Sequence, residues 1–257
     1  MKMRAKTLLL VIGVACLGTQ AIAQSRIPAL PKGAVVLETR NLPSLKGRQR
    51  QLVLWMLNPK RNPNGYKRDD LYMCPDQTRG SYYSGPARVS LLDPNGKRII
   101  NTVKIAGPYE EGGDSFDLPY AIRAGYYYPV VPRPRDGEAK PTIIWLRDYN
   151  GDGKALEFAL FEAEACMGLQ TTLIGYSEKQ DRVIQYPISL EMIEGTKRST
   201  STSPWADYLF SKKPERPGFW KYEIDYRGRA GSLDKWEVRY NPSRERFEGK
   251  LISIAGE

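Results

Sequence analysis

Apolar and polar residues alternate along this chain in short runs that are rich in β-branched and aromatic side chains and are separated by Gly, Pro and Asn. A period of two predicts strands with one buried face. We expect strands over residues 33–40, 50–58, 87–92, 98–105, 125–131, 141–149, 155–163, 169–177, 182–193, 219–227, 235–241 and 246–255. The pattern therefore predicts a mostly β fold, an antiparallel sandwich or an irregular barrel with at most one or two short helices.

Turn residues between these runs predict two hairpins. Asp93-Pro94-Asn95-Gly96 joins two of the runs, and Asn-Gly is a strong hairpin signal because both residues tolerate positive φ. The polar residues 178–181 separate another pair of runs. Sequential strands are therefore expected to pair with each other in antiparallel fashion.

The second half of the chain contains the best helix candidate and the best candidate for a linker. Residues 203–212 predict a helix of two or three turns, because Ser203 and Pro204 suit its first positions. The Ser/Thr-rich residues 194–204 are typical of a flexible loop, which would precede a C-terminal β segment over 205–257. Three strands are marginal alone, so we expect one β-rich domain over residues 24–257.

The first residues have the pattern of an export signal. A short basic head is followed by an apolar run too short to span a bilayer, and Ala21-Ile22-Ala23 provides a small-x-small cleavage site before Gln24. We therefore expect a signal peptide over 1–23 and a periplasmic or secreted mature protein. In an alternative interpretation, Cys16 is a lipidated cysteine. No later stretch predicts a transmembrane helix.

Removal of that segment would leave two cysteines, Cys74 and Cys166. In an oxidising compartment this number predicts a disulfide between them. The alternative is two separate buried thiols, because a sequence does not show whether two Cα atoms lie within bridging distance.

The charge of the chain narrows the choice of partners. The formal net charge is +10, but the basic residues are scattered and no nucleic-acid-binding motif is present. Scattered positive charge is typical of a solvated surface with a weak attraction to anions. We expect no nucleic-acid partner, and we regard a glycan or an anionic component of the cell envelope as the candidate partner.

The chain contains no histidine, which excludes Ser-His-Asp and Cys-His catalysis and the common zinc sites built from histidine. A pair of carboxylates remains as the candidate catalytic machinery, as in glycoside hydrolysis. Glu162 and Glu164 are two residues apart, so on a strand they would face the same way about 7 Å apart. Solvated acidic pairs are common, and spacing is the only support for this interpretation.

The most specific pattern is Asp148-Tyr149-Asn150-Gly151-Asp152-Gly153. It matches the D-x-[DN]-x-[DN]-G opening of a calcium loop, in which alternating short side chains direct oxygen atoms to one point and the last Gly permits a sharp bend. The loop resembles those of EF-hands, dockerin modules and integrin-type propeller blades. The resemblance is confined to the loop, and Ala159 occupies the place of the bidentate Glu of an EF-hand. It implies a Ca²⁺ ion held by the side chains of Asp148, Asn150, Asp152 and Glu157 and by the carbonyl of Lys154.

A simpler alternative is open for the same residues. Asn-Gly and Asp-Gly are ordinary turn dipeptides, and a polar turn between two strands needs no metal. The leading functional hypothesis is an exported, non-catalytic β protein with a structural calcium loop that binds a glycan or an envelope partner. The alternative is a carboxylate-dependent polysaccharide hydrolase.

Overall fold

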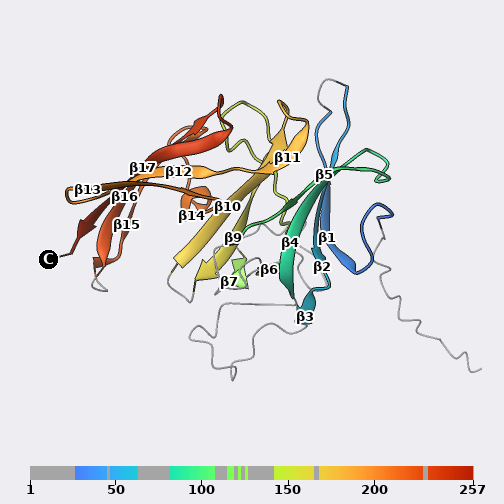
Figure 1. Ribbon diagram of the computed structural model, residues 1–257, viewed down its shortest axis with the longest axis horizontal. Helices are drawn as coiled ribbons and strands as arrows, with labels where there is room; N and C mark the ends of the chain where they lie inside the picture. Colours follow the sequence, from blue (N-terminus) through green and yellow to red (C-terminus); the bar gives the residue numbers. More distant parts are fainter. Residues whose placement is uncertain are drawn as a thin grey trace, which may run out of the picture.

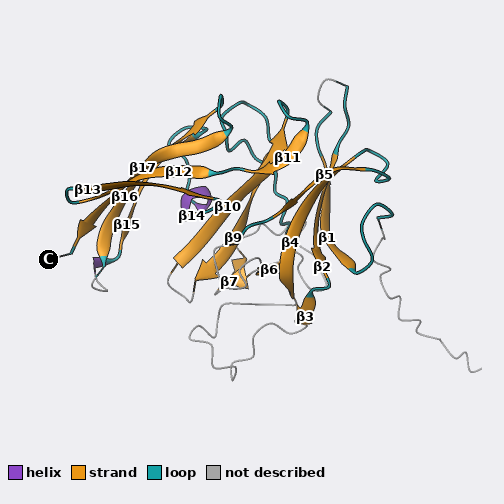
Figure 2. Cartoon of the chain, in the orientation of Figure 1, coloured by secondary structure: helices purple, strands orange, loops and turns teal. Residues whose placement is uncertain are grey.

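Three β-sheets follow one another along the long axis of the molecule (Figure 1). The computed structural model describes residues 27–44, 47–62, 82–107, 115–118, 121–122, 125–126, 142–164, 168–227 and 231–256. Strands dominate this part of the chain, and helical structure is confined to short turns (Figure 2).

The first sheet is six-stranded and is centred on β2 and β4. β2 pairs with β1 and β4, while β3, β5 and β6 each pair with β4, all in antiparallel fashion. Its strands are β1 (Ala34–Asn41), β2 (Gln51–Leu57), β3 (Lys60–Asn62), β4 (Tyr82–Leu92), β5 (Ile99–Lys104) and β6 (Ser115–Leu118). The predicted hairpin at residues 93–96 joins β4 to β5, with Gly96 at a φ of 64°.

Both faces of β2 are buried, which explains why its sequence is apolar without interruption. Leu54 and its neighbours on one face belong to the main core. Val53 and Trp55 on the other face form a small cluster with Leu30, so the segment before β1 covers this side of the sheet. Burial on two faces removes the alternation expected of a strand with one solvated face.

The middle sheet is four-stranded and is built around β10, which is buried along almost its entire length. β10 pairs with β9, β11 and β14. The strands of this sheet are β9 (Glu157–Glu164), β10 (Gly168–Ser177), β11 (Arg182–Gln185) and β14 (Ala206–Asp207). A separate two-stranded ribbon consists of β7 (Ala121–Ile122) and β8 (Gly125–Tyr126).

The third sheet is five-stranded and has the order β13-β12-β17-β16-β15. β12 and β17 run parallel to each other, and the other pairs in this sheet are antiparallel. Its strands are β12 (Ile188–Glu194), β13 (Lys197–Ser203), β15 (Phe219–Asp225), β16 (Ser232–Asn241) and β17 (Arg246–Ala255).

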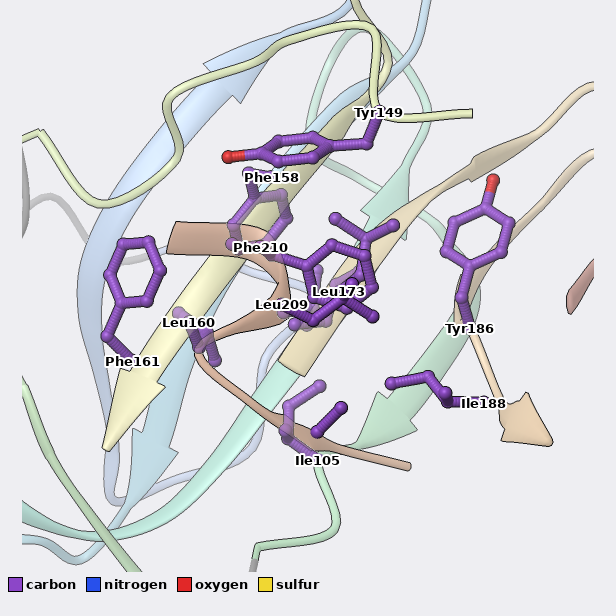
Figure 3. Packing of buried hydrophobic residues seen from close by; sticks show 14 of the residues in the cluster. Ile105, Tyr149, Phe158, Leu160, Phe161, Leu173, Tyr186, Ile188, Leu209 and Phe210 are labelled. Carbon is purple, nitrogen blue, oxygen red and sulfur yellow. The ribbon is translucent and has the colours of Figure 1, made fainter. Parts of the chain in front are cut away.

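One cluster of buried side chains contains residues from all three sheets (Figure 3). Its aromatic part joins the middle sheet to the third: the Phe210 ring makes edge-on contacts with Tyr149 at 5.8 Å, with Trp220 at 5.7 Å and with Phe247 at 5.1 Å between ring centroids. Edge-to-face packing of this kind is favoured because the positive edge of one ring meets the negative face of the next.

The predicted fold class is confirmed. The described chain is mostly β with several antiparallel sheets, and these sheets do not close into a barrel, so the sandwich-like alternative is the correct one. A helix long and apolar enough to cross a membrane is absent from the described residues.

The predicted helix over 203–212 is wrong. Residues 206–207 form β14 on the edge of β10, and a 3-10 turn, η1 (Leu209–Ser211), follows. Tyr208 has a φ of 56°, which breaks any continuous helix. Thr171 fixes this path, because its hydroxyl donates to the Ala206 carbonyl at 2.8 Å and accepts from the Phe210 N–H at 3.1 Å.

The flexible loop predicted over 194–204 is also wrong, because residues 197–203 form β13. β13 pairs with β12 over seven consecutive residues, from Ile188 opposite Ser203 to Glu194 opposite Lys197. Exposed Ser and Thr residues fit a linker and a solvated edge strand equally well, so composition alone did not separate the two.

The run 141–149 is not a strand in its described part. Only Arg147 pairs there, in an isolated bridge with Glu157. The N–H groups of Ile143 and Ile144 donate to Oε2 of Glu38 on β1, at 2.6 and 3.2 Å. A side chain of the first sheet thus satisfies backbone groups that a strand would have paired in a ladder.

Candidate functional site

The polar loop before β9 curls around two glycines. Gly151 and Gly153 have φ values of 80° and 84°, a region that side chains disfavour. The loop therefore adopts the sharp bend that the Asn-Gly-Asp-Gly sequence predicts.

Asp148 holds the loop together. Its Oδ1 accepts the N–H groups of Gly151 at 2.7 Å and Asp152 at 3.2 Å, and its Oδ2 accepts that of Gly153 at 2.9 Å. The next two polar side chains each accept one backbone N–H group from the residue two positions later. Asn150 Oδ1 accepts from Asp152 N at 2.9 Å, and Asp152 Oδ1 accepts from Lys154 N at 2.9 Å.

These bonds show why short oxygen-bearing residues alternate here. Each one satisfies backbone donors that the turn leaves without a ladder partner. Lone pairs remain on the other side-chain oxygens of the loop, because a carboxylate offers about four acceptor positions and only Asp148 Oδ1 accepts two N–H groups of the loop. A turn and a cation-binding loop therefore share this geometry.

Glu157 lies behind the loop and not in the solvent. Its side chain is fully buried, with Oε2 accepting from Tyr149 N at 3.1 Å and Oε1 accepting from Asn150 Nδ2 at 3.0 Å. Gly175, its partner on β10, makes room for it: a Cβ there would lie 2.7 Å from Glu157 Cγ. The missing side chain on β10 thus creates the space that this carboxyl occupies.

Burial raises the pKa of Glu157 to about 8, although hydrogen bonds from the backbone of Tyr149 and Asn150 lower it. The negative charges of Asp152 and Asp148 raise this pKa further. Burial also raises the pKa of Tyr186, and the charge of Glu157 adds to the effect. Removing water and gathering negative charge both oppose ionisation of Glu157, so the free loop favours its protonated form near neutral pH.

The loop packs closely against the turn that leads into β15. A Cβ on Gly151 would lie 2.7 Å from the Pro217 carbonyl oxygen, and one on Gly218 would lie 2.6 Å from the Asn150 carbonyl oxygen. Two backbones approach this closely because both positions are glycine. The loop is therefore a joint between the middle sheet and the third sheet.

The two basic side chains near the loop, Lys154 and Arg147, both contact groups outside the loop carboxylates. The Lys154 ammonium pairs with the Glu178 carboxylate, which raises the pKa of Lys154. Arg147 lies over the exposed Trp145 ring, 5.9 Å from its centroid. The Lys154 charge is thus shared with Glu178, so the two loop carboxylates, Asp148 and Asp152, are not balanced by it alone.

A group of three or more His, Cys, Asp or Glu residues placed to hold a metal ion does not occur among the described residues. Asp148 and Asp152 lie on the exposed loop, and Glu157 points inward below it. The oxygens that the loop itself offers are two carboxylates, the amide oxygen of Asn150 and the Lys154 carbonyl. Such a mixture suits Ca²⁺, which accepts hard oxygens of several kinds and keeps water ligands.

Glu162 lies at the other end of β9 and also has an unusual environment. Its Oε2 is enclosed and has no hydrogen-bond partner among the described residues. Burial raises its pKa well above the ordinary value, and the charge of Asp117 on β6 raises it further, although the Asp117 N–H lowers it. The backbone of Glu164 lies in β9, but its side chain is outside the described residues.

The register of the middle sheet places other polar groups beside Glu162. Gln170 on β10 is its direct partner, and Asp207 on β14 is the partner of Gln170. Directly paired residues project from the same face of a sheet. Asp117 is connected to the first sheet, because its Oδ1 accepts a hydrogen bond from Ser84 Oγ on β4 at 2.5 Å. Glu162 therefore lies in a polar belt between the first and middle sheets.

Cys74, Cys166 and residues 1–23, including Cys16, lie outside the described residues. The disulfide, the export signal and the lipidation alternative remain predictions from the sequence.

Two residues of interest, Asp117 and Trp145, could not be recognised from the sequence pattern. Asp117 lies in an acidic stretch, but nothing in the sequence paired it with Glu162. Trp145 lies in a run predicted to be a strand, yet the residue is 36% exposed. The position of Trp145 just before the polar loop was the one feature of the sequence that indicated exposure.

Comparison of the chain with models of protein families, with curated proteins and with solved structures gave no match.

Proposed function

We propose that the chain is an exported, non-catalytic β protein in which Ca²⁺ binds the loop through Asp148, Asn150, Asp152 and the Lys154 carbonyl. The observation that carries this proposal is the gathering of three carboxyl groups at one joint of the fold: two on the loop and a third, Glu157, buried beneath it with a raised pKa. A divalent cation would offset this charge and favour ionised Glu157. Its role would be structural, because the loop joins the middle and third sheets.

Thermal unfolding with calcium and with chelator tests the metal. We expect a higher melting temperature in Ca²⁺, because a ligand that binds only the folded chain stabilises it by mass action. Asp152→Ala should remove this increase. Asp225→Ala is a matched control, since Asp225 Oδ1 also accepts an N–H two residues later, from Arg227 at 3.0 Å, and lies away from the loop. Identical melting curves in calcium and in chelator would refute the calcium site.

The partner in this proposal is a glycan or an anionic component of the envelope. Trp145 supports it, because an exposed indole beside a cation offers an apolar face and a charge together. A glycan array should give binding that Trp145→Ala abolishes and that Ile254→Ala, a second exposed apolar residue, leaves intact. Equal binding by the two variants would contradict a role for Trp145.

A second candidate function is a carboxylate-dependent polysaccharide hydrolase. The observation that favours it is Glu162, whose raised pKa suits a general acid and whose neighbour Asp117 is a second carboxyl. A panel of chromogenic glycosides tests it. Turnover that Glu162→Gln abolishes and Glu223→Gln preserves would support the hydrolase. Glycan binding without turnover would support the non-catalytic protein.

A further inference from the structure

The two edges of the third sheet differ in how they meet the solvent. β15 forms one edge and carries an exposed charge at every second position, at Lys221, Glu223 and Asp225. Charged side chains on an edge strand discourage pairing with another chain. β13 forms the other edge, and residues 199–203 are exclusively Ser and Thr.

β13 has the geometry of a strand that can accept a partner. It pairs with β12 without a bulge, and no other strand in the described part of the chain is hydrogen-bonded to it. Alternate residues of an antiparallel strand direct N–H and C=O groups away from the existing partner. The bulges, prolines and inward charges that commonly protect an edge are absent from residues 197–203.

The positions of the charges of β13 permit pairing with a second copy of the same strand. Lys197 and Arg198 are at one end of the strand. In an antiparallel pair of two copies with all seven residues aligned, Lys197 lies opposite Ser203 and Arg198 opposite Thr202 of the second copy. The basic residues are then at opposite ends and do not face each other. Thr200 lies on the two-fold axis, opposite its own counterpart.

Other alignments are less favourable. Shifting the register towards the basic end brings Arg198 of one copy opposite Arg198 of the other, and like charges directly opposite destabilise a strand pair. Shifting it the other way shortens the overlap. We propose that two copies of this chain pair through the free edges of β13, in antiparallel orientation centred on Thr200, to form one continuous ten-stranded sheet across the dimer. Such an interface is isologous and closed, as in most homodimers.

Sedimentation velocity of the full chain over a range of concentrations tests this pairing. We expect the mass of the wild type to rise towards that of a dimer. Thr200→Lys and Thr200→Glu should each remain monomeric, because two like charges would meet on the axis. An equimolar mixture of these two variants should dimerise again, which loss of folding would not produce.

Lys221→Glu on β15 is the control variant, and it should dimerise as the wild type does. A second experiment uses Thr200→Cys, because residues directly opposite each other lie within disulfide range. It should cross-link on oxidation above the wild-type background, and Ser203→Cys should not.

A wild type that remains monomeric at every concentration would overturn the proposal. So would a dimer that Thr200→Lys leaves intact, or one that Lys221→Glu abolishes, since the interface would then lie elsewhere.

Discussion

Glu157 and Glu162 stand at the two ends of the same strand and project from opposite faces of β9. Burial raises the pKa of both. Glu157 accepts two hydrogen bonds and lies under a loop that opens to solvent, whereas Glu162 has an oxygen without a partner among the described residues and lies between two sheets. Two residues of one type on one strand therefore have different environments: N–H groups of the loop bind the first, and the second has an enclosed oxygen between packed strands.

The largest expected effect comes from closing the space around Glu157. In Gly175→Ala, the added Cβ would also lie 3.0 Å from the Leu156 carbonyl oxygen, so the strands must shift. Overpacking of this kind costs about 1–3 kcal/mol of unfolding free energy, measured by urea denaturation.

A double variant separates the two sources of that clash. Glu157→Ala removes the nearest atom, so Gly175→Ala should cost less in that background. The part of the cost that persists in that background reports the contacts with the Leu156 carbonyl oxygen at 3.0 Å and Glu157 Cα at 3.1 Å. Equal costs in the two backgrounds would show that the Glu157 side chain does not fill this space.

The next effect is on the pH dependence of stability. Each raised pKa means that the folded chain retains a proton that the unfolded chain has lost. The contribution of that carboxyl to stability is therefore fully present below about pH 4.5 and is lost as pH rises, for Glu157 until about pH 8. The chain contains no histidine, so no imidazole titrates in this range. Glu157→Gln and Glu162→Gln should each reduce the slope of unfolding free energy between pH 5 and 8. A slope unchanged in both variants would contradict the two raised pKa values.

Calcium should separate the two carboxyls within the same measurement. A cation on the loop favours ionised Glu157 and lowers its pKa, so Ca²⁺ should flatten the part of the slope that Glu157→Gln removes. The part that belongs to Glu162 should persist in calcium, because β9 separates it from the loop. A slope that calcium flattens equally in parent and Glu157→Gln would place the ion elsewhere.

The smallest effect concerns Asp117. Its charge raises the pKa of Glu162, but burial is the larger cause. Asp117→Asn should therefore lower the pKa of Glu162 only slightly, measured by NMR titration of the Glu162 side chain. A return to the ordinary pKa would show that charge, and not burial, controls this carboxyl.

Hairpins and buried strands were readable from the sequence because their signals are local. The local sequence was enough to predict the turn at residues 93–96 and the buried strand β2. Residues 197–203 and 203–212 were misjudged because the deciding contacts come from elsewhere: β12 pairs with the first, and Thr171 fixes the path of the second. At the candidate site, the loop was predictable because its motif is local. The room at Gly175, the contact with Pro217 and the approach of Asp117 to Glu162 all depend on residues distant in sequence.

The position of β17 has a consequence for the order in which this chain can fold. β17 is the last strand in sequence but lies inside the third sheet, bonded to β12 on one side and β16 on the other. During synthesis, which starts at the N-terminus, strands of the first and middle sheets are available early. The edge of β12 that pairs with β17 stays unpaired until residues 246–255 have been made. Loss of those ten residues would leave two facing strand edges, those of β12 and β16, open in the same molecule, so truncation within β17 should destabilise the whole third sheet.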